Sequence, residues 1–320
     1  MQRIAILIVN YNSGTLLERC LQCLRDQHLA PVRIIVVDNH SSDGSERVCA
    51  AFAGVQLLRQ PDNLGFAEAC NIGVKAASDC DWIAMLNPDA FAAPDWVEAM
   101  SAALHRYPEY DSFACRLLDA ADPAQLDGAG DVYHMSGLPW RRFHGERDTA
   151  AAGVCEEVFA PCAAAALYRR SALESAGGFD AALFCYLEDV DIGFRLQLMG
   201  MRCLYLPTAV VHHMGSAIAG RRSGFQVYHG HRNLVRVFVK NMPGVLFWLL
   251  LPVHVVLNVV SVVWFAARGQ PGTILRAKRD ALRDLPAAWR MRRRVQRLRV
   301  APLARVWSLL DKSLLWRASP

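Results

Sequence analysis

Four short apolar segments lie in the first 90 residues, and each is followed by polar residues and then by a stretch with helical patterning. The segments span residues 4–9, 32–37, 55–58 and 82–86. Alternation of strands and helices at this spacing is typical of a parallel sheet that is covered by helices on both faces and joined by right-handed crossovers. We therefore predict an α/β fold with a mostly parallel central sheet and flanking helices.

The fourth segment ends abruptly at Asn87, Pro88 and Asp89. An apolar run that stops at a turn predicts a buried parallel strand, and open α/β sheets bind ligands beyond the carboxyl ends of their strands. Pro88 fixes its own φ and restricts the residue before it, so a stiff turn presents the Asp89 carboxylate. Because Asn-Pro-Asp is also ordinary turn chemistry, this motif alone leaves a catalytic and a structural role open.

The ends of the other strands carry side chains suited to a nucleotide. Asp38 suits a base edge, Asn10 and Tyr11 suit a base face, and the three expected helix N-termini suit phosphates. Taken singly, each residue is as well explained by a turn or a helix cap. Together they predict a nucleotide-sized site with Asp89 at its far end. No G-x-G-x-x-G or P-loop occurs, which argues against the dinucleotide and ATP folds that carry those motifs.

The pattern is less regular after Asp89. We expect strands over residues 112–117 and 184–187, and a second long apolar run covers residues 158–168. Between them, residues 119–152 form a glycine-containing stretch that we expect to be irregular. Loops of this length are uncommon in compact domains unless they bind or cover something. The stretch is therefore a candidate acceptor loop or lid, with a plain surface excursion as the alternative.

Three acids, Glu188, Asp189 and Asp191, begin an expected helix that runs to about residue 199. Acids in a first helical turn complement the helix macrodipole, and Asp191 can pair with Arg195 four residues later. That structural explanation suffices for Asp191. For Glu188 and Asp189, which follow an aromatic segment, we favour a base that deprotonates a hydroxyl group.

Adjacent histidines, His212 and His213, follow an expected strand over residues 202–206. Neighbouring side chains of an extended segment point in opposite directions, so only one of the two can face a metal ion together with Asp89. One carboxylate and one imidazole are a small set of protein ligands. They are adequate where a diphosphate supplies further oxygens to Mg²⁺ or Mn²⁺.

Composition sets the class of protein and the compartment. Of 320 residues, 53% are hydrophobic, which is enough for a large core. Ten cysteines lie mostly among apolar neighbours and no secretory leader is recognisable, so we expect reduced thiols in a cytoplasmic setting. Cys20 and Cys23 form a C-x-x-C on an apolar helical face, where core packing is favoured over metal or redox chemistry.

The C-terminal part is both apolar and basic. Residues 245–267 are long enough to span a bilayer, which needs about 20 residues. Four residues interrupt the segment: Pro252, His254, Asn258 and Ser261. Because polar groups inside a span are costly, we predict instead an interfacial or re-entrant helical hairpin.

Residues 268–320 carry 14 Lys and Arg against 3 Asp, within a chain of net charge +5. We expect this second helix of the hairpin to lie against anionic headgroups. The alternatives are a buried helix with a solvated basic face and a nucleic-acid surface, and we disfavour nucleic acid. Three tryptophans suit a membrane interface: Trp289, Trp307 and Trp316.

Several short strings of the chain occur together in one family. Three look like nucleotide-binding segments: Asn10-Tyr11-Asn12, Asp38-Asn39 with Ser41–Ser45, and Asn63-Leu64-Gly65 with Asn71. Others look like metal and acceptor segments: Asn87-Pro88-Asp89, Gly177–Asp180 with Glu188–Asp191, and His213-Met214-Gly215-Ser216, followed by Arg232-Asn233. With these strings in family order, the chain over about residues 3–240 resembles the family 2 glycosyltransferases of the GT-A fold, and most closely their bacterial rhamnosyltransferase-like branch.

The resemblance implies a GT-A nucleotide-diphospho-sugar transferase domain over residues 1–240 and a membrane-associating helical region over 241–320. It implies that Asp189, beside Glu188, is the catalytic base and that Asp89 and His213 hold Mg²⁺ or Mn²⁺. The first acid of the family's D-x-D motif is Asn87 here, which leaves Asp89 as the expected carboxylate ligand. The nucleotide sugar is expected to contact Asn10, Tyr11, Asn12, Asp38, Asn39, Asn63, Gly65, Asn71 and Asn87.

We therefore predict an inverting glycosyltransferase that moves a sugar to a lipid-linked or cell-envelope saccharide such as an O-antigen precursor. By the resemblance, L-rhamnose from dTDP-rhamnose is the leading donor. The enzyme is expected at the cytoplasmic face of a bacterial inner membrane as a peripheral or monotopic protein. Both a monomer and a homo-oligomer are compatible with the sequence. The alternatives are a UDP-sugar donor and a non-catalytic nucleotide-sugar-binding scaffold subunit. A processive polymerase is disfavoured because no Q-x-x-R-W occurs.

Overall fold

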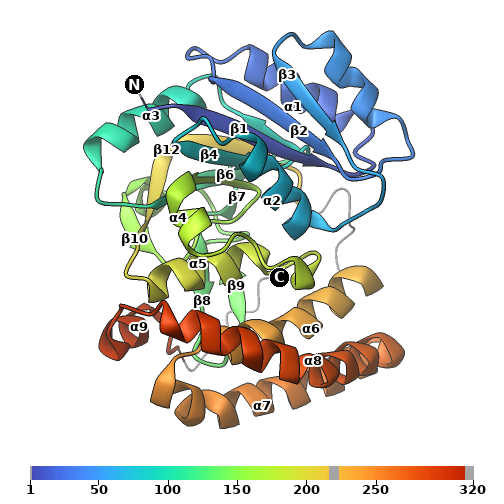
Figure 1. The fold of residues 1–320 in the computed structure, drawn as a ribbon, viewed down its shortest axis with the longest axis vertical. Coiled ribbons are helices and arrows are strands. Elements are labelled where there is room, and N and C mark those ends of the chain that lie inside the picture. The colour runs from blue at the N-terminus through green and yellow to red at the C-terminus, as the bar shows by residue number, and fades with distance from the viewer. Residues whose placement is uncertain (1, 216–222, 314–320) are drawn as a thin grey trace.

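A computed structural model describes residues 2–215 and 223–313 of the chain. Within these ranges the fold contains a ten-stranded mixed sheet, helices on both of its faces and a layer of C-terminal helices at one end (Figure 1). Two residues named in the sequence analysis, Ser216 and Trp316, lie outside the described ranges.

The predicted alternation of strands and helices forms the first half of the sheet. Its strands are β1 (Ile4–Asn10), β2 (Arg33–Asp38), β3 (Val55–Arg59) and β4 (Trp82–Leu86). They are all parallel, in the order β4-β1-β2-β3, and Asn10 is level with Asp38. The connections contain α1 (Leu16–Arg25), the 3₁₀ helix η1 (Ser45–Ala51) and α2 (Phe66–Ala76). The carboxyl ends of these strands therefore meet at one edge, as predicted.

The second half of the sheet mixes both directions. β11 (Ala165–Arg169) is antiparallel to β4 and to β6 (Ser112–Asp119), and β12 (Cys203–His213) is parallel to β6. Shorter strands pair with these: β5 (Ala90–Ala92), β7 (Leu126–Gly128) and β10 (Glu156–Val158). Because β5 is antiparallel to β12 with Ala90 opposite His213, the turn that ends in Asp89 lies beside the histidines.

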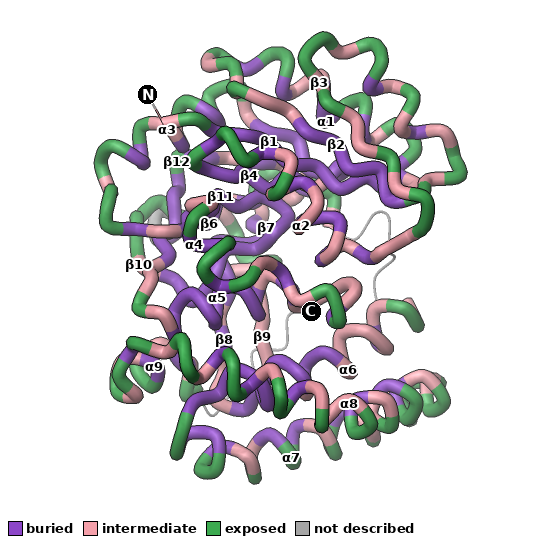
Figure 2. Tube along the Cα trace, viewed as in Figure 1, coloured by how far each residue is buried: buried purple, intermediate pink, exposed green. Residues whose placement is uncertain are grey.

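Alternate side chains of β1 build a core on each face of the sheet. On one face Ile6 packs with α1 and α3 (Trp96–Arg106). On the other face Leu7 packs with α2, α4 (Arg170–Ser175) and α5 (Glu188–Leu198). Figure 2 shows β1 and β4, between these layers, as buried along their whole length. Burial on both faces explains why β1 and β4 are continuous apolar runs in the sequence.

Two local expectations, those for residues 184–187 and for residues 119–152, are wrong. Residues 184–187 do not form a strand: after the short helix η3 (Ala181–Leu183), φ is positive at Phe184, Tyr186 and Leu187, a conformation that strands exclude. The apolar run at 158–168 joins two strands, β10 and β11. Residues 119–152 are more regular than expected, since they contain β7, a hairpin of β8 (Asp131–Tyr133) and β9 (Pro139–Arg141), and η2 (Ala150–Gly153).

The C-terminal helices are α6 (Gly224–Asn241), α7 (Gly244–Ala267), α8 (Pro271–Arg297) and α9 (Leu303–Leu309). α8 packs along α6 and α7 packs along α8, at the lower end of Figure 1. Their apolar core also includes Tyr133, Phe159 and Phe194. The core therefore crosses the boundary that the sequence predicts between residues 240 and 241.

A buried ion network joins α5 to α6. Arg195 Nη2 lies 2.8 Å from Asp191 Oδ2, which is the predicted pair within α5. Lys240 of α6 is fully buried, and its Nζ lies 2.7 Å from Asp191 Oδ1 and also contacts Asp180. Because Lys240 neutralises both buried carboxylates, Asp191 joins α5 to α6, and Asp180 joins the segment before η3 to α6.

Candidate active site

A cavity of about 850 Å³ opens beyond the carboxyl ends of β1, β2 and β4. Its wall also includes the start of α5, the hairpin β8–β9 and the first turn of α6. Ligand pockets commonly enclose about 300–1,000 Å³, so the space suits a nucleotide sugar. Ten of the predicted site residues line it: Tyr11, Asn12, Asn39, Asn63, Gly65, Asn87, Asp89, Glu188, Asp189 and His213.

Three of the predicted nucleotide-binding residues do not line the cavity: Asn10, Asp38 and Asn71. Asn10 is fully buried, and its Nδ2 donates to Asp38 Oδ1 at 2.8 Å. Asn71 exchanges two hydrogen bonds with the backbone of Phe179, at 2.8 and 2.9 Å. These contacts orient neighbouring segments, and direct contact of the three residues with a nucleotide stays a prediction.

Gly65 joins the nucleotide side of the cavity to the segment before α5. Its φ is +83°, and a Cβ there would lie 2.6 Å from the backbone oxygen of Phe184. The same oxygen accepts a hydrogen bond from the N–H of Ala67 at 3.2 Å. Only glycine fits a positive φ and this close approach together.

Asp89 and His213 face each other inside the cavity. His213 Nε2 lies 3.4 Å from Asp89 Oδ1, and His213 Nδ1 lies 2.7 Å from Asp127 Oδ2. Burial lowers the pKa of His213, but its hydrogen bonds with Asp127 and Asp89 outweigh that effect and raise the pKa above its usual value. His212 is level with Phe91 on the neighbouring strand and does not line the cavity, so His213 is the histidine that faces Asp89.

Asp127 is a site residue that the sequence analysis missed. It is buried and contacts the Arg141 guanidinium, while His144 Nδ1 lies 3.5 Å from its Oδ1. Although burial raises the pKa of Asp127, the charge of Arg141 and the hydrogen bonds of His144 and His213 hold it well below its usual range. The sequence signal that could have indicated Asp127 was an acid and an arginine within the glycine-containing stretch of residues 119–152.

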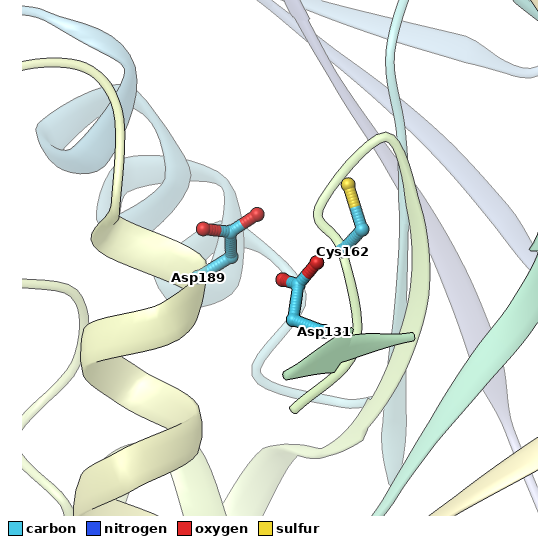
Figure 3. A group of neighbouring side chains, drawn as sticks. All are labelled: Asp131, Cys162 and Asp189. Carbon is cyan, nitrogen blue, oxygen red and sulfur yellow. The ribbon is translucent and has the colours of Figure 1, made fainter. Parts of the chain in front are cut away.

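Asp131, also missed, lies next to Asp189 (Figure 3). One ligand atom from each of Asp131, Cys162 and Asp189 lies within 4.8 Å of the other two. Burial and the nearby Asp189 raise the pKa of Asp131 well above its usual value. The thiol in this group is a poor ligand for Mg²⁺ or Mn²⁺, so the group suits proton chemistry better than those ions.

Two backbone N–H groups fix the Asp189 carboxylate. Ala163 donates to Oδ2 at 3.0 Å and Val190 donates to Oδ1 at 2.8 Å. The neighbouring Glu188 is buried, and its Oε2 has no hydrogen-bond partner among the described residues. Burial and the charge of Asp189 raise the pKa of Glu188 well above its usual value, which favours its neutral form. Asp189 is therefore the better placed of the two to act as a base.

The strained turn before α5 is held by α6. Asn233 is fully buried, and its Nδ2 donates to the carbonyl groups of Leu183, Cys185 and Tyr186 at 2.8–2.9 Å. Arg232 Nη2 donates to Leu183 O at 2.8 Å. The Arg232-Asn233 pair thus stabilises a backbone conformation that costs free energy by itself and that presents Glu188 and Asp189 to the cavity.

A family profile described as "Glycosyl transferase family 2" matches residues 5–177. The chain belongs to this family. It is therefore a glycosyltransferase, and the match covers the strand ends, Asp89, Asp127 and Asp131. Glu188, Asp189 and His213 lie beyond the matched residues.

Relatives of this glycosyltransferase include two enzymes of Mycobacterium tuberculosis. An N-acetylglucosaminyl-diphospho-decaprenol L-rhamnosyltransferase is 29% identical over 253 residues, which cover 71% of this chain and 81% of the relative. A pre-mycofactocin glycosyltransferase is 28% identical over 212 residues, which cover 66% of this chain and 42% of the relative.

Two solved structures show the same fold. GalNAc-T7 with UDP, GalNAc and Mn²⁺ superposes with a TM-score of 0.59 at 16% identity, over 75% of this chain and 48% of the other. The mannosyltransferase PcManGT of Pyrobaculum calidifontis, with GDP-Man and Mn²⁺, gives a TM-score of 0.54 at 18% identity, over 96% of this chain and 86% of the other. The predicted GT-A fold is confirmed.

Proposed function

We propose that this glycosyltransferase transfers L-rhamnose from dTDP-rhamnose to a lipid-linked saccharide, with inversion at the anomeric carbon. The observation that carries the proposal is that Asp89, His213 and Asp189 face one cavity together with the ends of β1 and β2. The similarity to the M. tuberculosis rhamnosyltransferase supports the sugar and the lipid-linked acceptor. The dTDP group rests on the family resemblance of the sequence.

The donor fits along the strand ends. We place its base and ribose against Tyr11 and Asn39, and its diphosphate near Asp89, because all three line the cavity and follow the ends of the neighbouring strands β1, β2 and β4. Tyr11 is 41% exposed and offers an aromatic face for stacking. In this pose the sugar points toward the start of α5.

Asp89 and His213 suit a divalent cation. They offer a carboxylate oxygen and an imidazole nitrogen, and Asp127 holds the other imidazole nitrogen, as a carboxylate does in many metal–histidine sites. When bound, Mg²⁺ or Mn²⁺ would neutralise the charge that develops on the leaving diphosphate. Both neighbours of known fold were solved with Mn²⁺, which supports a divalent ion.

Asp189 is the proposed base. It accepts the proton of the acceptor hydroxyl while that oxygen forms its bond to the anomeric carbon, and the bond from that carbon to the diphosphate oxygen breaks on the opposite face. One displacement of this kind inverts the anomeric configuration and leaves the nucleoside diphosphate as the second product. The raised pKa of Glu188 favours its neutral form, which makes Glu188 the poorer acceptor of this proton.

The outer face of α7 supports a membrane location. α7, Gly244–Ala267, is long and apolar enough to cross a membrane. In its most apolar stretch of 18 residues, 33% is buried inside the protein. The polar residues that interrupt it point inward: His254 Nδ1 lies 2.8 Å from Ser136 O, and Asn258 Oδ1 accepts a hydrogen bond from Lys278 at 2.6 Å. Large apolar side chains occupy the exposed face: Val245, Trp248, Leu249, Val255, Val256, Val259, Val260, Val263 and Trp264.

α7 therefore combines a polar inner side with an apolar outer side, and it lies along α8 rather than apart from the protein (Figure 2). This arrangement suits a helix that lies in the membrane interface. Exposed Leu275, Leu282 and Trp289 extend the apolar surface onto α8, which is rich in arginine. Arginine attracts the anionic lipids of the cytoplasmic leaflet, so we place the enzyme on that face of the inner membrane.

Hydrolysis of a panel of nucleotide sugars tests the donor and the metal. Purified protein is expected to release dTDP slowly from dTDP-rhamnose, and both EDTA and Asp89→Ala are expected to abolish the release. Release of UDP from a UDP-sugar, with no release of dTDP, would change the proposed donor but leave the proposed reaction unchanged. If no nucleotide sugar is hydrolysed and neither dTDP nor UDP binds, the proposed function is wrong.

Asp127→Asn tests how His213 is held. We expect the affinity for Mn²⁺ in the presence of dTDP to fall about 10- to 100-fold, the usual effect of losing a carboxylate that orients a histidine ligand. Titration followed by electron paramagnetic resonance of free Mn²⁺ measures this affinity without turnover. Asp148→Asn is the control, because Asp148 lies in the same stretch of residues 119–152 but contacts Arg116 instead of His213. Equal affinities of the two variants would remove Asp127 from this role.

A further inference from the structure

One end of the helical layer borders the cavity. Phe225, in the first turn of α6, lines the cavity, and a Cβ on Gly224 would lie 3.7 Å from Thr273 in the first turn of α8. The last turn of α7 contacts α6, because the ring centroids of Phe265 on α7 and His231 on α6 are 4.8 Å apart. The last turn of α7, the first turn of α8 and the cavity-lining first turn of α6 therefore lie at the same end of the helical layer (Figure 1).

A row of rings, which we call the aromatic ridge, leads from the cavity to the surface of α6. It consists of Phe184, Phe225, His229 and Tyr228. The centroid of the His229 ring lies 5.2 Å from that of Phe184, 4.4 Å from that of Phe225 and 5.0 Å from that of Tyr228. Rings at these distances form a continuous packed surface.

Two arginines lie at the outer end of the aromatic ridge. The guanidinium carbon of Arg276 is 4.4 Å from the centroid of the Tyr228 ring, and that of Arg232 is 5.8 Å from it. In the part of the chain that the structure describes, neither arginine pairs with a carboxylate. The acid nearest along α8, Asp280, pairs with Arg279 and Arg283, and its Oδ2 also accepts a hydrogen bond from the Tyr228 hydroxyl at 3.0 Å.

The region is positive for two further reasons. The first turns of α6 and α8 contain no acidic residue, so nothing there offsets the positive ends of their dipoles. Burial and then the charges of Arg232 and Arg276 lower the pKa of His229 to about 4. An anion that reaches this end of the layer meets the guanidinium group of Arg276 and the Nη1 side of Arg232, whose Nε and Nη2 already donate to Asn233 Oδ1, Ala182 O and Leu183 O.

We infer that Arg276 and Arg232 bind the diphosphate of a prenyl-diphosphate-linked acceptor, whose sugar enters the cavity along the aromatic ridge while its prenyl chain lies on the face of α7. The inference rests on the proposed function, since it concerns the acceptor of that reaction. Guanidinium groups match phosphate geometry and bind it through paired hydrogen bonds. The apolar face, the two cations and the cavity follow one another in the order in which such a molecule presents its chain, diphosphate and sugar.

Binding of farnesyl diphosphate to the full chain in neutral detergent micelles tests the inference. We expect Arg276→Glu to weaken binding about 10- to 100-fold, because it removes charge-assisted hydrogen bonds and adds repulsion. Farnesol, which lacks the diphosphate, is expected to bind the variant and the wild type equally. Arg106→Glu is the matched control, since the guanidinium carbon of Arg106, the last residue of α3, lies 5.3 Å from the ring centroid of Tyr107.

Equal affinity of wild type and Arg276→Glu for farnesyl diphosphate would overturn the inference. So would a variant that loses affinity only for vesicles containing phosphatidylglycerol, because Arg276 would then serve general membrane attraction. Hydrolysis of dTDP-rhamnose by the same samples separates the two proposals. Farnesyl diphosphate binding that depends on Arg276, without hydrolysis of any nucleotide sugar, would retain the anion site and reject the proposed function.

Discussion

Asp189→Asn is expected to lower sugar transfer by about 10²- to 10⁴-fold, the usual contribution of a general base, and to leave donor binding unchanged. The amide keeps the size of the carboxylate but only one acceptor oxygen, so it can accept the hydrogen bond of Ala163 or that of Val190 but not both. The capacity to take a proton is lost together with one of these two hydrogen bonds. Transfer from dTDP-rhamnose and the affinity for dTDP, measured on the same preparation, separate the two effects.

Glu188→Gln provides the control for this prediction. The raised pKa of Glu188 favours its neutral form, and the amide reproduces the shape of a neutral carboxyl group. We therefore expect the glutamine variant to retain most of its transfer activity. If it loses as much activity as Asp189→Asn, or if Asp189→Asn keeps full activity, the base lies elsewhere, and Asp131 is the next candidate because it shares the group shown in Figure 3.

The sheet edge could be predicted because its pattern is local. Each apolar run predicts one buried strand, and parallel strands joined by crossovers place their carboxyl ends together. For this reason Tyr11, Asn39 and Asp89 line one cavity, although they belong to three different strand ends. The match to the family then supplied the chemistry that the spacing alone left open.

Asp127 and Asp131, in the stretch of residues 119–152, could not be predicted in the same way. Asp127 meets His213 across 86 residues of sequence, and no local period links them. β7 and β8 are only three residues long and contain Asp or Gly, so they lack the alternation that marks a strand. Their place depends on pairing with β6 and β9, which is a tertiary property.

The turn before α5 was mispredicted for a different reason. Its aromatic residues have strand propensity, yet φ is positive at Phe184, Tyr186 and Leu187. Tertiary hydrogen bonds from Asn233 and Arg232 outweigh that propensity. The sequence analysis gave the Arg232-Asn233 string no structural role, and only the folded chain shows which carbonyl groups it holds.

Val256→Asp with Val260→Asp is expected to release the protein from membranes. The two side chains are 61% and 56% exposed on the outer face of α7, so the core beneath the helix stays intact. Burying an aliphatic side chain of this size contributes about 1.5–3 kcal/mol, and two new carboxylates oppose insertion, so partitioning should fall on the order of 10²-fold or more. Sedimentation with vesicles that contain phosphatidylglycerol measures the bound fraction.

The control is Val32→Asp with Val154→Asp, which places the same charges at two exposed valines of the α/β part. It should sediment with vesicles like the wild type. Hydrolysis of dTDP-rhamnose should stay the same in all three proteins, whereas transfer to a lipid-linked acceptor in vesicles should fall only in the α7 variant. Equal sedimentation of the two double variants would mean that the apolar face of α7 does not contact lipid, and the aromatic ridge would then open toward solvent instead of toward the chain of its acceptor.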